Sequence, residues 1–267
     1  MKTPFKRSLC AALSFALIPS AAIAAPDSAS PYNAIATGLS IPSNATGASL
    51  GARTNVNSRS VVIDAASATL FMMEGGRVVD SMRVIVGKEG STPELQTALT
   101  YTTLNPYWHA PPDLAQSLIA PRVLKEGFGY LKAKGYQVVT RFAEDAEVID
   151  PKSVDWKAVA AGRKKGFIRQ LPGPQNSMGQ MKFSLASGGS IYLHDTPKKA
   201  LFEEDDRSIS NGCIRLEDAP RLARWLLGRD PIVQSAQAEQ HVALPRSVPI
   251  TITYLDKGAQ AQLAALR

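Results

Sequence analysis

The hydrophobic pattern of the chain changes near residue 59, where short apolar runs begin to alternate with turn-forming residues. The runs are rich in β-branched residues and are separated by stretches of Ala, Ser and Gly, which is the pattern of a β-meander. Strands are expected at 60–64, 69–73, 77–86, 98–104, 181–185, 191–194 and 248–255. The pattern therefore predicts a mainly β (α+β) domain.

A different pattern, with Pro-rich loops and helical periodicity, interrupts the strands at 105–173. Helices are expected at 112–126, at 154–161 before Gly162, and between the N-cap residue Asp218 and the stop residue Gly228. An irregular insertion of roughly 65 residues is long enough to suggest a functional lid. The sequence thus predicts a β domain with a partly helical capping insertion.

The first 24 residues have the three parts of a secretory signal peptide. Lys2, Lys6 and Arg7 form a basic start, an apolar run follows at 9–18, and small residues allow cleavage after Ala24. The apolar run has about half of the roughly 20 residues that a spanning helix needs, which disfavours an uncleaved anchor. A lipoprotein is excluded because Cys10 lies inside the run, and export of the mature chain is expected.

The remaining chain is expected to have three parts. Residues 25–58 form a low-complexity tether, 59–255 a folded domain that contains the insertion, and 256–267 a C-terminal tail. At 45% hydrophobic and 20% charged residues, the composition is that of an ordinary globular protein and excludes collagen-like and multi-span membrane proteins.

The charge balance changes this picture little. Cleavage after Ala24 removes three of the 30 basic residues and none of the 23 acidic ones, which leaves 27 − 23 = +4. A mild positive charge is compatible with a carboxylate-rich partner, and it gives no argument for binding nucleic acid.

Of the two cysteines, Cys10 and Cys213, only the second remains after export. A single thiol in an oxidising compartment has three readings: a buried core residue, a link between two copies, or a nucleophile. Its neighbours Ser210, Asn211, Gly212 and Arg215 are not an apolar run, which favours the nucleophile.

A histidine and a cysteine stand in a pattern that suits nucleophilic catalysis. His194 ends a predicted strand, and Cys213 follows 213 − 194 = 19 residues later, a loop long enough to place the thiol beside the imidazole. Gly212 permits a tight turn and close approach of a substrate, and the amides of Gly212 and Cys213 are candidate donors to an oxyanion. Arg215 lies on the same face as Cys213 and would lower the pKa of the thiol. The alternatives are a structural histidine and an ion pair of Arg215 with Glu217 or Asp218.

These residues resemble the active-site signature of the L,D-transpeptidase (YkuD) family: His194-Asp-Thr-Pro, then Ser210-x-Gly212-Cys213-Ile-Arg215. Further segments resemble the larger Gram-negative members that carry a capping insertion, and together they extend the likeness over roughly 58–255. They lie at 104–108, 111–112, 148–151, 171–174, 179–183 and 247–254. Many relatives have His or Ser where this chain has Asn211.

The resemblance implies a β-sandwich in which two mixed sheets cradle a helix. It implies that Cys213 is the acylated nucleophile, that His194 is the general base, and that the backbone carbonyl of Asp195 orients His194. Gly212 would donate its amide to the oxyanion, and Arg215 would stabilise the thiolate or the substrate. The substrate-binding residues would be Trp108, Tyr192, Ser210 and Asn211. The insertion would cover the donor site.

The implied activity is periplasmic cross-linking of peptidoglycan. Cys213 would attack the diaminopimelate–D-Ala bond of a tetrapeptide stem, release D-Ala and pass the acyl group to an amine, which gives a 3→3 cross-link. Hydrolysis, exchange with free D-amino acids and release of wall-bound protein are alternatives, as is an inactive wall-binding module. A sortase is disfavoured because its Thr-Leu-x-Thr-Cys signature is absent.

The resemblance also implies the partners. Peptidoglycan stems are the expected substrates, carbapenems are expected inhibitors, and other wall-synthesis proteins are candidate partners. The larger relatives carry a separate peptidoglycan-binding domain, so wall binding is expected to come from the catalytic domain or from such partners. No metal or cofactor is expected, because His109 and His241 have no Cys, Asp or Glu at zinc-ligand spacing.

Overall fold

The computed structural model describes residues 58–188, 191–231 and 237–267. The predicted signal peptide, Cys10 and the predicted tether up to residue 57 lie outside these ranges, so the expectations about them stay predictions. None of the helices in the described ranges is long and apolar enough to cross a membrane.

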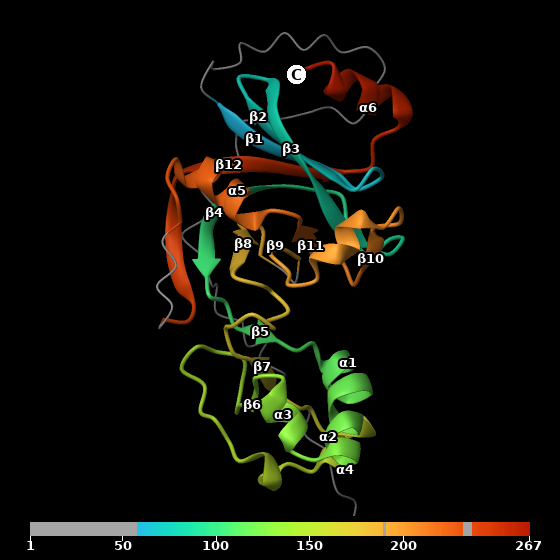
Figure 1. The fold of residues 1–267 in the computed structure, drawn as a ribbon, viewed down its shortest axis with the longest axis vertical. Helices are drawn as coiled ribbons and strands as arrows, with labels where there is room; N and C mark the ends of the chain where they lie inside the picture. Colours follow the sequence, from blue (N-terminus) through green and yellow to red (C-terminus); the bar gives the residue numbers. More distant parts are fainter. Residues whose placement is uncertain (1–57, 189–190, 232–236) are drawn as a thin grey trace, which may run out of the picture. The chain divides into compact units, whose positions relative to one another are not determined.

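Most described strands belong to a nine-stranded sheet with the order β10-β3-β11-β9-β8-β4-β12-β1-β2. Its strands, labelled in Figure 1, are β1 (Arg59–Asp64), β2 (Thr69–Glu74), β3 (Arg77–Gly87), β4 (Leu95–Leu104), β8 (Met181–Leu185), β9 (Tyr192–His194), β10 (Ser208–Ser210), β11 (Ile214–Leu216) and β12 (Gln240–Thr253). All seven predicted strands are present. The last begins at Gln240 instead of 248, and its register shifts between Ala243 and Val248, where the strand accommodates Pro245.

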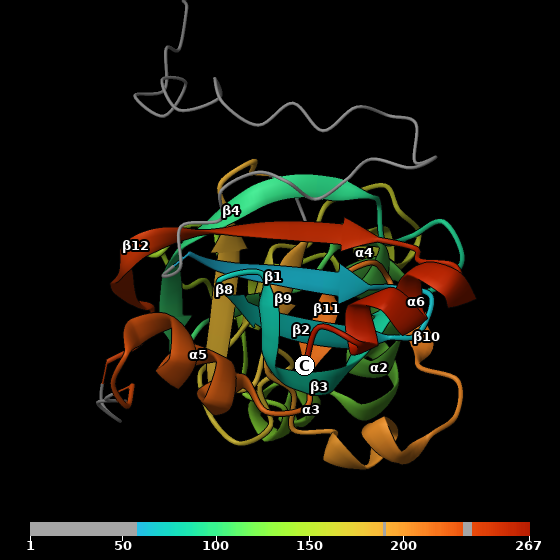
Figure 2. The same cartoon turned by 90° about the horizontal axis from the view of Figure 1, so that it is seen from above.

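The nine-stranded sheet curves until its ends meet. Strand β3 lies between β10 and β11 in this order and also pairs with β2, the strand at the far end. Figure 2 shows β4, β12, β1, β2 and β3 following one another around this curve. Pairing is parallel for β1–β12, β11–β9 and β10–β3 and antiparallel elsewhere. The mainly β class is confirmed. The two sheets that were expected to form a sandwich are continuous with each other in a single nine-stranded sheet.

Helix α5 (Ala219–Leu227) packs one apolar face against the curved sheet. The Asp218 carboxylate accepts a hydrogen bond from the Arg221 amide at its start, and Gly228 ends it with a φ of +69°. Leu222 and Leu226 lie in the main hydrophobic core with the strands. Each such side chain contributes about 1.5–3 kcal/mol through burial. Because α5 directly follows β11, this packing also fixes the strand that follows Cys213.

The segment between β4 and β8 forms a second core of its own, which includes Ile119, Trp156 and Ile168. Its elements are β5 (Trp108–His109), α1 (Pro112–Leu114), a π-helical turn (Ala115–Ile119), α2 (Ala120–Glu126), α3 (Gly129–Ala133), β6 (Tyr136–Val138), a 3-10 turn (Pro151–Ser153), α4 (Trp156–Ala160) and β7 (Ile168–Gln170). The predicted helix 112–126 is present but contains the π turn, in which the Ala120 amide donates to Ala115 O. The irregularity precedes Pro121, which has no amide hydrogen for the regular helical bond.

The predicted C-terminal tail contains helix α6 (Lys257–Ala264), capped by the Asp256 carboxylate. Leu263 packs against a small apolar cluster on β2 and β3. A 3-10 turn (Lys199–Glu203) completes the described elements and lies between β9 and β10.

Candidate active site

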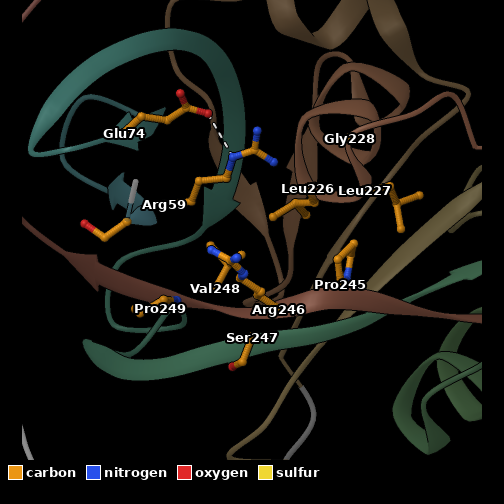
Figure 3. Close-up of a pocket in the computed structure, with 11 residues that line it drawn as sticks. Arg59, Glu74, Leu226, Leu227, Gly228, Pro245, Arg246, Ser247, Val248 and Pro249 are labelled. Carbon is orange, nitrogen blue, oxygen red and sulfur yellow. Dashed lines mark hydrogen bonds and ion pairs between the residues drawn. The ribbon is translucent and has the colours of Figure 1, made fainter. Parts of the chain in front are cut away.

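Two of the cavities at the surface of the described residues have volumes of about 600 Å³ or more. The first, of about 640 Å³, lies beside the end of α5 and the bulge of β12 (Figure 3). The Arg59–Glu74 ion pair (2.8 Å) crosses its edge, and neither cysteine nor histidine is among its lining residues. It therefore lacks the groups that the sequence predicts for nucleophilic catalysis.

The second cavity, of about 600 Å³, contains both predicted reactive side chains. Cys213 and His194 line it together with Ser210, Asn211 and Arg215. The remaining lining residues are Trp108, Pro111, Leu114, Leu118, Arg122, Tyr130, Lys134, Tyr136, Gln170, Gln175, Ser177, Met178 and Lys198. The capping insertion thus supplies a large part of the wall, and this cavity is the candidate active site.

Neighbouring parallel strands bring the cysteine and the histidine to one place. In the β9–β11 pair, Leu193 lies beside Ile214 and His194 beside Arg215. Cys213 immediately precedes β11 and continues this register opposite Tyr192, so its side chain lies on the same face as Arg215 and His194, two positions along the strand from the histidine. The side chain of His194 is 6% exposed, and Cys213 is half-buried.

His194 is held through one ring nitrogen. Its Nδ1 lies 2.5 Å from the backbone carbonyl oxygen of Asp195, and because a carbonyl only accepts, Nδ1 carries the hydrogen. The lone pair is then on Nε2. Burial lowers the pKa of His194 to about 4, outweighing the Asp195 hydrogen bond that raises it, and nearby Arg215 lowers it further. At neutral pH the imidazole is uncharged and able to accept a proton.

Burial is also the largest influence on Cys213, and it raises the pKa of the thiol. A hydrogen bond with the Tyr192 backbone and the charge of Arg215 lower the pKa, but by less. Arg215 thus acts in the expected direction without producing a net decrease. A protonated thiol beside a neutral imidazole fits activation by a general base better than a preformed ion pair.

The position of Gly212 requires glycine for packing. Its φ is +124°, and a Cβ atom there would lie 2.6 Å from the carbonyl oxygen of Ser91. Its amide donates to Ser210 Oγ (3.0 Å), and its carbonyl accepts from Thr92 Oγ1 (2.8 Å). The Gly212 amide is thus bonded within the turn, and its expected role as an oxyanion donor stays a prediction.

The four expected substrate-binding residues have different positions. Trp108, Ser210 and Asn211 line the cavity, whereas Tyr192 is not among its lining residues. The ring of Tyr192 instead packs beneath the Lys182 ammonium, 5.6 Å from its centroid. Ser210 has a local structural function as well, because its hydroxyl donates to Cys213 O (2.7 Å).

Arg215 does not form the structural ion pair that the sequence left open. Glu217 is taken by Arg83 (2.6 Å), and Asp218 caps α5. Within the described ranges Arg215 has no ion-pair partner, and it lines the cavity next to Cys213. The structure therefore leaves its guanidinium available to a ligand.

A polar network behind the histidine was not foreseen. The Asp195 carboxylate accepts from the Lys199 ammonium (2.7 Å) and the Gln180 amide (3.0 Å). Lys199 also donates to Glu217 O (2.7 Å), which ties the end of β9 to the end of β11. The i,i+4 spacing of Asp195 and Lys199 was a weak signal, but nothing in the sequence indicated the contact with Glu217.

The charges of the cavity were also missed. Arg122, Lys134 and Lys198 join Arg215 in its lining, and none of the described lining residues is Asp or Glu. These four cations come from distant parts of the chain, so only the tertiary structure brings them together. The site is suited to a ligand that carries carboxylates.

A second group of titratable residues lies where the insertion meets β12. Ligand atoms of Glu144, Glu239 and His241 lie within 4.8 Å of one another, although sequence spacing indicated no acidic neighbours for His241. His241 Nε2 is 2.8 Å from Glu144 Oε1, and Glu239 pairs with Lys182 (3.7 Å). The His241–Glu144 and Lys182–Glu239 contacts explain why these residues lie together, because the first of them joins the insertion to β12.

Comparisons with known proteins identify the family. The model of the YkuD family, the L,D-transpeptidase catalytic domain, matches residues 58–233. This is more than half of the chain, and the protein belongs to this family. A Haemophilus influenzae protein named "Putative L,D-transpeptidase" is 32% identical over 168 residues, which are 62% of this chain and 33% of that protein. The chain thus spans about a third of the length of this relative.

Solved structures of L,D-transpeptidases also match. One from Mycobacterium smegmatis is 14% identical, covers 73% of this chain and 58% of its own, and has a TM-score of 0.33. Another, in complex with imipenem, is 13% identical, covers 73% of this chain and 59% of its own, and has the same TM-score of 0.33.

Proposed function

We propose that the protein is a peptidoglycan L,D-transpeptidase in which Cys213 is the acylated nucleophile and His194 the general base. The observation that carries the proposal is that both side chains line one cavity, with Nδ1 of His194 fixed by the Asp195 carbonyl. Family membership supports the reaction class, and the uncharged state of His194 supports its function as a base.

The first step is acylation. His194 Nε2 takes the thiol proton as Cys213 Sγ attacks the carbonyl carbon of the diaminopimelate–D-Ala bond. The C–N bond then breaks, His194 returns the proton to the leaving nitrogen, and D-Ala departs. A thioester remains on Cys213. Arg215 balances negative charge on the thiolate or on a substrate carboxylate.

The second step transfers the acyl group. The side-chain amine of a second diaminopimelate attacks the thioester, gives its proton to His194, and restores the thiol. The product is a 3→3 cross-link. Transfer to water gives a tripeptide, and transfer to a free D-amino acid gives an exchanged stem. Where the amide that Cys213 attacks joins the stem to a wall-bound protein, the protein amine is the leaving group, and hydrolysis of the thioester completes release of the protein. The chemistry uses only side chains of the chain, without a metal or organic cofactor.

The predicted signal peptide at 1–24 supports a periplasmic site of action, where stems are exposed. The cationic cavity supports a substrate with several carboxylates, and wall-synthesis proteins are proposed as partners there. Carbapenems are proposed to acylate Cys213, as acyl donors that mimic the stem.

The test is incubation with purified disaccharide-tetrapeptide. Release of D-Ala by the native protein and its loss in Cys213→Ala support the proposal, and the mass of the product names the acceptor. A carbapenem adduct on intact native protein, absent from Cys213→Ala, reports the nucleophile independently. A folded native protein that forms neither thioester nor adduct refutes the proposal and leaves a wall-binding module.

A further inference from the structure

The cavity above Cys213 has two chemically distinct parts. The catalytic strands and their loops supply the reactive residues, whereas the capping insertion supplies aromatic rings and two cations, Arg122 and Lys134. A stem peptide that reaches Cys213 must also lie against the insertion. The residues of the insertion are therefore in a position to select the donor.

Lys134 is the cation of the insertion that is available to a ligand. Arg122 pairs with Glu126 at 2.9 Å on the same helix. Lys134 has no ion pair with any residue in the described ranges. No Asp or Glu shares the described cavity lining with it, so a carboxylate of the ligand would not compete there with one from the protein.

The backbone of Lys134 is fixed, which limits where its side chain reaches. The residue caps the C-terminal end of α3, and its carbonyl accepts a hydrogen bond from Gln170 Nε2 (3.0 Å). The same amide group donates to Gln175 O (3.0 Å), and both glutamines line the cavity. Lys134 is thus anchored to β7 and to the loop that forms part of the wall.

The aromatic residues beside Lys134 give a surface for the apolar parts of a peptide. The ring of Tyr136 lies 6.2 Å from that of Trp108 and 6.0 Å from that of Tyr130. Burial raises the pKa of Tyr136 to about 12, so its hydroxyl stays neutral and does not repel a carboxylate. A cation next to neutral aromatic rings fits a carboxylate on an otherwise aliphatic chain.

From these observations we infer that Lys134 is a specificity residue that binds a carboxylate of the acyl donor, one that remains on the donor after D-Ala leaves. The inference rests on the proposed function. In a tetrapeptide stem two carboxylates meet this condition, that of the diaminopimelate side chain and that of the glutamyl residue. Lys134 recognises one of them at a distance from the scissile bond.

The test compares variants and substrates in pairs. D-Ala release is measured with the free stem, with the stem amidated on diaminopimelate and with the stem amidated on glutamate. Lys134→Gln is compared with Lys132→Gln, an exposed lysine of α3 that is not among the cavity-lining residues. We expect Lys134→Gln to lower kcat/KM for the free stem about tenfold, equivalent to about 1.4 kcal/mol, and Lys132→Gln to leave it unchanged.

The amidated stems locate the contact. One of them should be processed about tenfold more slowly by the native protein, and Lys134→Gln should cause no further loss with it. A loss of the same size with all three stems, or an equal effect of Lys132→Gln, overturns the inference while the proposed function stands. Absence of D-Ala release and of a carbapenem adduct in the native protein overturns both.

Discussion

Gly179→Ala tests whether the carboxylate of Asp195 supports His194, the proposed general base. Gly179 has a φ of +62°, and a Cβ atom there would lie 2.3 Å from Asp195 Oδ2. Gly135 is a matched control, because its φ is +65° and a Cβ atom there would meet nothing within 4 Å. Both substitutions introduce the same backbone strain, and only Gly179→Ala displaces the carboxylate.

The magnitudes follow from this difference. A left-handed backbone costs an alanine about 1–2 kcal/mol, which is the full effect expected for Gly135→Ala. In Gly179→Ala the carboxylate must also leave the Lys199 ammonium and the Gln180 amide, at 2.7 and 3.0 Å. Loss of these bonds adds about 1–3 kcal/mol, reduced because Lys199 is half exposed. We expect a total of about 2–4 kcal/mol.

Two measurements check this prediction. Urea unfolding gives the free energy of unfolding, and the rate of carbapenem adduct formation gives the reactivity of the site. Because the Asp195 carbonyl holds His194, a displaced Asp195 should slow acylation about 10- to 100-fold in Gly179→Ala and leave Gly135→Ala near the native rate. Equal destabilisation and equal rates for the two variants would refute the reasoning.

Three further predictions concern charge. The pKa of His194 is lowered to about 4, so as the pH falls the unfolded chain takes up a proton on this histidine before the folded protein does. The free energy of unfolding should therefore fall by up to about 3 kcal/mol between about pH 6.5 and pH 4. Urea titrations should show this decrease in the native protein and not in His194→Gln. Burial raises the pKa of Cys213, so alkylation by iodoacetamide should keep increasing above pH 9, and Arg215→Gln should slow it at each pH; a plateau below pH 8 would contradict this. Lys199→Met removes the contacts with Asp195 and Glu217 that position His194, and it should lower the rate of carbapenem adduct formation about tenfold. Lys199→Arg should restore the rate. A native rate in Lys199→Met would show that the Asp195–Lys199–Glu217 network does not contribute to the reactivity of the site.

The sequence predicts those parts of the fold that depend on local signals. The strands of the first meander and the helix between Asp218 and Gly228 are found where expected, because alternation and capping residues act within a few positions. The start of β12 was missed because prolines usually end a strand, and here a bulge accommodates Pro245. The closure of the sheet through β2 and β3 has no local signal, because it depends on how all the strands curve together.

The candidate site divides in the same way. The shared cavity of His194 and Cys213 was predicted from residue types and spacing. The position of Tyr192 outside the cavity lining and the use of the Gly212 amide depend on side-chain partners that spacing does not specify. Lys134 was missed because its contribution arises only when the insertion folds and lies over the cavity.

The two ends of the insertion lie side by side where it leaves and re-enters the sheet, and this affects how its sequence can change in evolution. Leu104 and Met181 are opposite each other in the antiparallel β4–β8 pair, and the Asn105 amide donates to Gln180 O (2.9 Å) just beyond them. The two ends of the insertion therefore meet as the two sides of a hairpin do. A segment joined in this way can be lengthened, shortened or exchanged without altering the register of the sheet. Substrate preference can therefore diverge by replacement of one module, while the strands that hold the cysteine and the histidine are inherited unchanged.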